Sequence, residues 1–117
     1  MVNLKYMKKN KLKHDKYRRA RGGYSRFLEI HCEHCGHVIA LYQKDGPGPL
    51  KRMYIDRIVS PEDFTKLQHL AIKRVPNLIC PHCKRLIGIP YIYEKEKRPA
   101  FRLFEGSVTK KISKANG

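Results

Sequence analysis

The chain has 117 residues, with 26 Lys and Arg against 10 Asp and Glu, and its formal net charge at pH 7 is +16. This length excludes more than one domain, and a charge of this size attracts polyanions and opposes compaction by self-repulsion. Because residues 1 to 26 are basic and contain no apolar run, we expect neither a signal peptide nor a transmembrane segment, and we expect a reducing, cytoplasmic location.

The positive charge is concentrated at the two ends of the chain. Residues 1 to 31 carry ten basic and two acidic side chains, and residues 95 to 117 carry seven and two. Residues 32 to 94 carry nine and six, so the two ends hold thirteen of the sixteen net charges. We expect residues 1 to 26 to be a basic N-terminal arm and residues 105 to 117 to be a basic C-terminal tail.

The predicted arm mixes cations with aromatic residues, which favours a nucleic-acid partner. Aromatic rings can stack on bases while the cations contact phosphate. A membrane-surface helix needs a strong apolar face, and this segment offers little beyond Leu4, Met7 and Leu12. We therefore expect the arm to supply most of the affinity for a polyanion. The interleaved aromatic residues are Tyr6, Tyr17, Tyr24 and Phe27.

After the arm, residues 27–31 and 38–42 read as two strands of a hairpin whose tip holds Cys32 and Cys35. Residues 44–52 follow and are too rich in Gly and Pro for a helix or a central strand. Two interpretations of this segment stay open. It is either a rigid connector or a stiff loop that presents Lys44, Lys51 and Arg52 to phosphate.

Residues 53–59 have strand-like composition, and the next segment predicts a helix near residues 61–73. Ser60 is a suitable cap, Pro61 fits the first turn, and Pro76 stops the helix. Phe64, Leu67, Leu70 and Ala71 recur at helical spacing. Beyond the helix, residues 87–93 and 101–104 are predicted to pair as antiparallel strands across a charged turn at residues 94–98.

All four cysteines lie in two Cys-x-x-Cys pairs, Cys32 with Cys35 and Cys80 with Cys83. Four thiolates match the tetrahedral ligand set of a structural zinc ion, so we expect one Zn²⁺. A disulfide framework, a thioredoxin-type pair and haem attachment fit the sequence less well. Iron in the same cage remains the alternative metal. Four nearby histidines are expected to face solvent or phosphate: His31, His34, His37 and His82.

Cys pairs flanked by strands resemble the zinc ribbon, a superfamily in which two hairpin tips share one metal ion. The resemblance covers residues 27–104 and rests on the four cysteines, Gly36 and the flanking strands. The chain differs from compact ribbons in one respect, since 44 residues separate Cys35 from Cys80. The resemblance implies a small α+β zinc-ribbon domain with two hairpins, one inserted helix, and basic extended N- and C-terminal tails. Small basic ribbons of this kind resemble several zinc-binding proteins of ribosomes.

The sequence therefore predicts a non-enzymatic zinc-ribbon protein that binds structured RNA, with ribosomal RNA favoured, in a ribosome or ribonucleoprotein with possible protein neighbours. A DNA-binding, transcription-related ribbon and a rubredoxin-like iron protein are the alternatives. An enzyme or a purely protein-binding ribbon is less well supported, because four sulfurs close the metal site and the charge favours a polyanion. The residues predicted to contact nucleic acid are Lys8, Lys9, Lys11, Lys13, Arg18, Arg19, Arg21, Arg26, Lys51, Arg52, Lys110 and Lys111.

Overall fold

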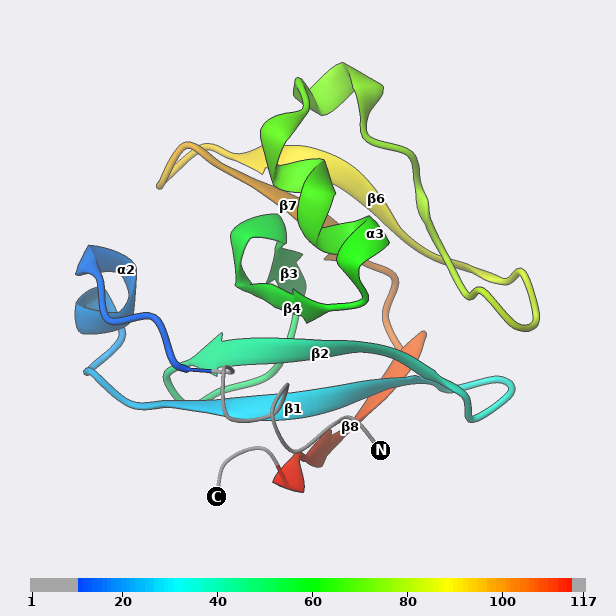
Figure 1. The fold of residues 1–117 in the computed structure, drawn as a ribbon, viewed down its shortest axis with the longest axis horizontal. Coiled ribbons are helices and arrows are strands. Elements are labelled where there is room, and N and C mark those ends of the chain that lie inside the picture. The colour runs from blue at the N-terminus through cyan, green and yellow to red at the C-terminus, as the bar shows by residue number, and fades with distance from the viewer. Residues whose placement is uncertain (1–10, 115–117) are drawn as a thin grey trace.

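The computed structural model describes residues 11–114, which form two antiparallel sheets (Figure 1). The first sheet has the strand order β4-β2-β1-β8 and the second has the order β3-β7-β6-β5. The strands of the first sheet are β1 (Ser25–Cys32), β2 (Val38–Asp45), β4 (Ile58–Ser60) and β8 (Val108–Ile112). Those of the second sheet are β3 (Arg52–Tyr54), β5 (Leu78–Ile79), β6 (Leu86–Tyr93) and β7 (Arg98–Leu103).

Helical segments in the described residues are short. An N-terminal helix, α2 (Lys16–Ala20), precedes β1, and α3 (Glu62–Thr65) follows β4. The 3-10 turns are η1 (Ile55–Arg57), η2 (Lys66–His69) and η3 (Ile72–Arg74). The Asp15 carboxylate caps α2 by accepting hydrogen bonds from the backbone N–H groups of Tyr17 and Arg18, both at 3.1 Å. Among the described residues, no helix has the length and apolar character that a membrane crossing requires.

The hydrophobic core lies between the two sheets and is shared by them. Residues of β1 and β2 pack with residues of β3, β6 and β7, because each sheet turns one apolar face toward the other. The buried hydroxyl of Tyr42 accepts a 2.8 Å hydrogen bond from the backbone N–H of Tyr54, which ties the sheets together directly. Core members from both sheets include Leu28, Ile30, Tyr42, Met53, Ile87 and Phe101.

The two predicted hairpins are confirmed. β1 pairs antiparallel with β2 from Ser25 opposite Asp45 to His31 opposite Val38, with the first Cys pair at the turn. β6 pairs antiparallel with β7 from Gly88 opposite Leu103 to Tyr93 opposite Arg98. Residues 53–59, predicted as one strand, instead form the end of β3, the turn η1 and the start of β4, so this segment passes from one sheet to the other.

The prediction of an α+β fold with one inserted helix is wrong: strands dominate, and residues 61–73 form no continuous helix. Leu70 and Ala71 have extended backbone between η2 and η3, and the side chains of both are exposed. Within residues 61–73, the apolar residues that pack against the core are Phe64, Leu67 and Ile72, and the last two are five positions apart. That spacing does not fit one face of a helix, so the chain extends to bring Ile72 to the core.

The prediction of extended tails is also wrong for the described parts of both ends. Residues 11–26 contain α2 and the first residues of β1, and residues 105–114 contain β8. β8 pairs antiparallel with β1, from Leu28 opposite Ile112 to Cys32 opposite Val108. The C-terminal segment forms a strand although its side chains are mostly polar, because the backbone hydrogen bonds of β8 to β1 do not require apolar side chains.

Candidate metal centre

The four cysteines meet where the tip of the β1–β2 hairpin approaches the loop between β5 and β6 (Figure 1). The Sγ atoms of Cys32 and Cys83 are 3.7 Å apart, and those of Cys35 and Cys80 are 3.6 Å apart. All four sulfurs lie within 4.8 Å of one another. Each close contact joins one Cys from the first pair to one from the second, so the centre links the two sheets.

The two Cys loops have the same backbone hydrogen bonds. The N–H of Gly36 donates to the carbonyl of Cys32 at 2.8 Å, and the N–H of Lys84 donates to the carbonyl of Cys80 at 2.9 Å. Both residues have a left-handed backbone, with φ of 81° at Gly36 and 68° at Lys84. The second loop therefore adopts the same turn without the glycine that such a φ favours. Two matching turns aim two thiol pairs at one point.

The sulfur positions suit a tetrahedral ion. A tetrahedron with metal–sulfur bonds of about 2.3 Å has edges of about 3.8 Å, close to the contacts of 3.7 and 3.6 Å. Cys32 and Cys80 are buried, and none of the four cysteines is in a disulfide. The expected metal-ligand set of Cys32, Cys35, Cys80 and Cys83 is thus brought together, and it can hold a metal ion.

The thiols of Cys35 and Cys80 differ in pKa. Burial opposes ionisation of Cys80, but hydrogen bonds from the backbone N–H groups of Cys83 and His82 lower its pKa to about 7. The backbone N–H of His37 favours the Cys35 thiolate, yet burial and the neighbouring thiols raise the pKa of Cys35 to about 11. Four sulfurs this close cannot all carry charge without a cation, so metal binding would release protons.

The histidines beside the centre differ in their surroundings. The rings of His37 and His82 are exposed and stack with centroids 3.5 Å apart and an interplanar angle of 12°. His34 is exposed, as expected. His31 is half-buried and bonds the carbonyl of Gly36 and the carboxylate of Glu29, both at 3.1 Å, so its ring is held by the protein.

The predicted nucleic-acid contacts fall into two groups. Half of those in the described residues are tied to other residues of the chain. Lys13 Nζ donates to the carbonyl of Asp56 at 2.6 Å, Arg21 pairs with Glu96 at 2.9 Å, and Arg52 Nε donates to the Tyr91 hydroxyl at 2.9 Å. Arg18 Nε donates to Ser25 Oγ at 2.9 Å, and the Arg26 guanidinium lies over the Tyr24 ring.

The other group is exposed and consists of Lys11, Arg19, Lys51, Lys110 and Lys111. The structure therefore leaves these cations available for a partner. Lys8 and Lys9 lie outside the described residues.

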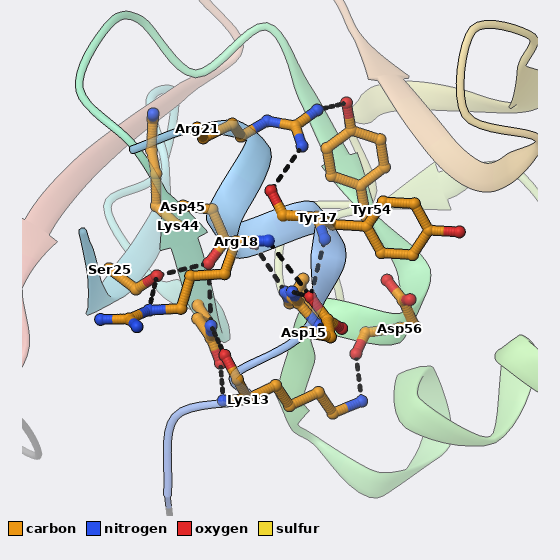
Figure 2. Close-up of polar contacts among 12 residues, drawn as sticks. Lys13, Asp15, Tyr17, Arg18, Arg21, Ser25, Lys44, Asp45, Tyr54 and Asp56 are labelled. Atoms are coloured by element: carbon orange, nitrogen blue, oxygen red, sulfur yellow. Dashed lines mark hydrogen bonds and ion pairs between the residues drawn. The ribbon is translucent and has the colours of Figure 1, made fainter. Parts of the chain in front are cut away.

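A buried ion network at the other end of the molecule was missed by the sequence analysis (Figure 2). Arg57 is 1% exposed. Its Nε donates to Asp45 at 2.8 Å, and its two terminal nitrogens donate to Asp15 at 2.6 and 3.0 Å. These hydrogen bonds hold the pKa of the Asp15 carboxyl well below its usual range. Asp15, inside a segment expected to be a free arm, thus closes a buried charge cluster.

Arg98 forms a second, adjoining cluster. Its guanidinium lies 4.0 Å from the ring centroid of Tyr17 and 3.7 Å from that of Tyr54. It also pairs with Asp56 at 2.9 Å and with Glu96 at 3.1 Å. Cation–π contact on two rings and two ion pairs offset the burial of this charge, while the buried Nε of Arg98 has no hydrogen-bond partner among residues 11–114. For the Arg57 cluster, the available sequence signal was Asp15, the single acid among residues 1 to 26.

Comparison with protein-family models, curated proteins and solved structures returned no match. The candidate functions therefore rest on the residues and their arrangement.

Proposed function

We propose that this protein is a non-enzymatic, zinc-ribbon-like protein that binds structured RNA, in a ribosome or another ribonucleoprotein. The observation that carries the proposal is the convergence of four thiol sulfurs within 4.8 Å in a chain of net charge +16. A zinc ion held by four thiolates has no position for a substrate or reactive water, so its role is structural. Unpaired thiols of this kind suit a reducing, cytoplasmic environment.

Zinc is the metal that we propose for the Cys centre. Four sulfurs in tetrahedral arrangement accept either zinc or iron. An electron carrier has no need of a net charge of +16, whereas a protein that contacts phosphate does. Elemental analysis of the purified chain should find one zinc per molecule. One iron per molecule, or folded protein without metal, would contradict this assignment.

RNA is the proposed partner because the exposed cations lie on several elements rather than along one helix. Lys11, Arg19, Lys51 and Lys110 are exposed, and they belong to the N-terminal segment, the loop before β3, and β8. The DNA-binding alternative relied on a helix at residues 61–73 entering a groove, and these residues form no continuous helix. Distributed cations suit the irregular backbone of a folded RNA.

The test is binding to a structured RNA and to a DNA duplex of matched length across a salt series. Each phosphate contact adds roughly 0.7 to 0.9 to the magnitude of the slope of log affinity against log salt. We expect a steep slope and a preference for the RNA. Tighter binding to the duplex would favour the DNA alternative. Absence of salt-dependent binding to both would contradict nucleic-acid binding.

The contribution of the arm should be tested by deleting residues 1 to 10, rather than 1 to 26. The longer deletion would also remove Asp15, Tyr17 and Arg21, which contact Arg57, Arg98 and Glu96 in the described structure. Removing residues 1 to 10 takes away three basic side chains, Lys5, Lys8 and Lys9, so the magnitude of the slope should fall by at most about 2.1 to 2.7. An unchanged slope would place binding on the rest of the chain.

A further inference from the structure

A groove runs between the Gly-Pro loop at residues 46–51 and the strands β6 and β7. It consists of three adjoining cavities. The first, of about 280 Å³, lies behind the loop and is lined by four cationic residues, Arg21, Lys44, Lys51 and Arg52, with one acid, Asp45. That acid is already bonded to Arg57, Ser25 and Gln43. Because Arg21 is paired with Glu96, the excess positive charge of the first cavity lies on Lys44, Lys51 and Arg52.

Cations crowd together around this first cavity. Lys44 Nζ donates to the carbonyl of Gly46 at 2.9 Å, which fixes the lysine against the loop. Burial and the neighbouring charges of Lys110 and Arg21 lower the pKa of Lys44. Arg21 lies near it and turns its guanidinium toward the Tyr54 hydroxyl, at 2.8 Å (Figure 2). Since the Arg21 guanidinium also pairs with Glu96 at 2.9 Å, an anion in this cavity would be attracted by Lys44, Lys51 and Arg52.

The second and third cavities, of about 620 and 440 Å³, continue the groove over β7. The second shares Pro49, Leu50, Lys51 and Arg52 with the first. Both are lined by Tyr91, Arg102 and Phe104, and also by one acid, Glu105. Their volumes fall in the range of about 300 to 1,000 Å³ that small-molecule sites occupy. The groove thus passes from a cationic end to an aromatic end.

Two cations and two apolar side chains of the groove are unengaged. Lys51 and Arg102 are exposed, and neither side chain has a hydrogen-bond or ion-pair partner within residues 11–114. Phe104 is 45% exposed and Ile89 is 44% exposed, next to Arg102 in the same groove. An exposed aromatic ring beside cations without ion-pair partners is the combination that binds a base together with its phosphate.

We propose that this groove binds a single-stranded segment of nucleic acid, with backbone phosphates on Lys51 and Arg102 and an unstacked base against Phe104. The inference rests on the proposed function. It identifies the groove as a nucleic-acid-binding surface in addition to the basic N-terminal segment. An acidic protein segment could satisfy the cations, but it would not use the exposed ring of Phe104 as a flat stacking surface. A duplex keeps its bases stacked inside and could not use the ring either.

The experiment measures binding of fluorescent oligouridine, oligodeoxythymidine, a duplex RNA and poly-glutamate to the full chain. Two variants remove groove groups: Phe104→Ala, and the pair Lys51→Ala with Arg102→Ala. Two matched controls remove similar groups that line none of these cavities: Leu70→Ala, 43% exposed, and the pair Lys73→Ala with Arg74→Ala. Circular dichroism and metal content verify that every variant is folded.

We expect Phe104→Ala to weaken binding of a single strand about tenfold, with the salt slope unchanged, because base stacking is lost. The Lys51 and Arg102 pair of substitutions should reduce the slope by about 1.4, for two single-strand phosphate contacts. Both control variants should have smaller effects. The single-stranded oligonucleotide that binds more tightly identifies the sugar preferred by the groove.

Several results would overturn the inference. Equal effects of the groove and control variants would mean that the groove is not the binding surface, while the proposed function would stand if structured RNA is still bound. If the groove substitutions weakened binding of poly-glutamate or of duplex RNA more than binding of either single strand, the groove would belong to another partner. If the full chain binds no RNA of any kind, the proposed function fails, and the inference fails with it.

Discussion

At the scale of single residues, the buried guanidinium of Arg57 joins three segments that are distant in the sequence. It bonds Asp45 at the end of β2 and Asp15 before α2, and its side chain is 0% exposed. Removing one partner of a buried ion pair leaves the other charge uncompensated, which costs about 3 to 5 kcal/mol. We therefore expect Arg57→Leu to lower the free energy of unfolding in urea by about this amount.

The control for this substitution is Lys97→Ala. Lys97 pairs with Glu94 at 3.3 Å, with side chains 81% and 75% exposed. An exposed pair of this kind contributes about 0 to 1 kcal/mol. If Arg57→Leu and Lys97→Ala lowered the stability equally, the ion network would have no role in holding the N-terminal segment.

The Asp15 carboxyl gives this network a dependence on pH. Its hydrogen bonds to Arg57 lower its pKa below the ordinary value of 3.8. A group whose pKa is depressed by folding stabilises the protein above the unfolded pKa, and loses that contribution as the pH falls through the folded value. The stability difference between the native chain and Asp15→Asn should therefore shrink as the pH falls below about 4. Urea unfolding of both proteins over an acid series checks this, and a constant difference would contradict it.

The two Cys turns differ at one position, which allows a matched test. Gly36 and Lys84 have the same left-handed backbone, with φ of 81° and 68°. A Cβ at Gly36 would meet no atom within 4 Å, so only the backbone conformation opposes a side chain there. That conformation costs a non-glycine residue about 1 to 2 kcal/mol.

We therefore expect Gly36→Ala to destabilise the metal-loaded protein by about 1 kcal/mol, while Lys84→Gly leaves the stability unchanged or raises it. Thermal unfolding at fixed metal concentration measures both. A larger loss for Lys84→Gly than for Gly36→Ala would show that the lysine side chain, which donates to the Pro81 carbonyl at 2.9 Å, outweighs the backbone cost.

At the scale of elements, β8 ties the C-terminal segment to both halves of the metal centre. It pairs with β1 up to Cys32, and the carbonyl of Ser107 accepts from the N–H of Glu33 at 3.0 Å. The Ser107 hydroxyl donates to the carbonyl of Ile87 in β6, also at 3.0 Å. This short segment therefore links the β1–β2 hairpin with the strand that follows the second Cys pair.

We expect deletion of residues 105–117 to lower both the stability and the metal affinity, since the two Cys loops lose a connection between them. Deletion of residues 115–117 is the matched control and should have little effect. Urea unfolding and competition with a chromophoric chelator measure the two quantities. If both deletions behaved alike, residues 105–114 would contribute nothing to the stability or to the metal affinity.

The elements that could be predicted from sequence are those marked by local signals. The Cys spacing, the glycine at position 36 and the flanking apolar residues predicted the convergence of the four cysteines and the β1–β2 hairpin. β8 has no such signal, because Val108–Ile112 is largely exposed and is held mainly by backbone pairing. The contact of Asp15 with Arg57 joins residues 42 positions apart, and charge counts carry no information about such pairs.

At the scale of the whole molecule, the two sheets are fastened at opposite ends. The Cys loops meet at one end, and α2 lies at the other (Figure 1). Near α2, the clusters of Arg57 and Arg98 join the N-terminal segment to both sheets. Between these ends lies a core that both sheets share. The protein thus differs from a small zinc finger, which has little core and is unfolded without its metal.

This arrangement predicts that metal removal loosens one end first. After chelation under reducing conditions, the amides of Gly36 and Lys84, bonded within the Cys loops, should exchange hydrogen rapidly. The amide of Tyr54, bonded to the buried Tyr42 hydroxyl, should keep most of its protection. Hydrogen exchange read by NMR, with and without one equivalent of zinc, measures this. Loss of protection at all three amides together would mean that the metal supplies the folding free energy of the whole chain, and that the ion clusters cannot hold the far end by themselves.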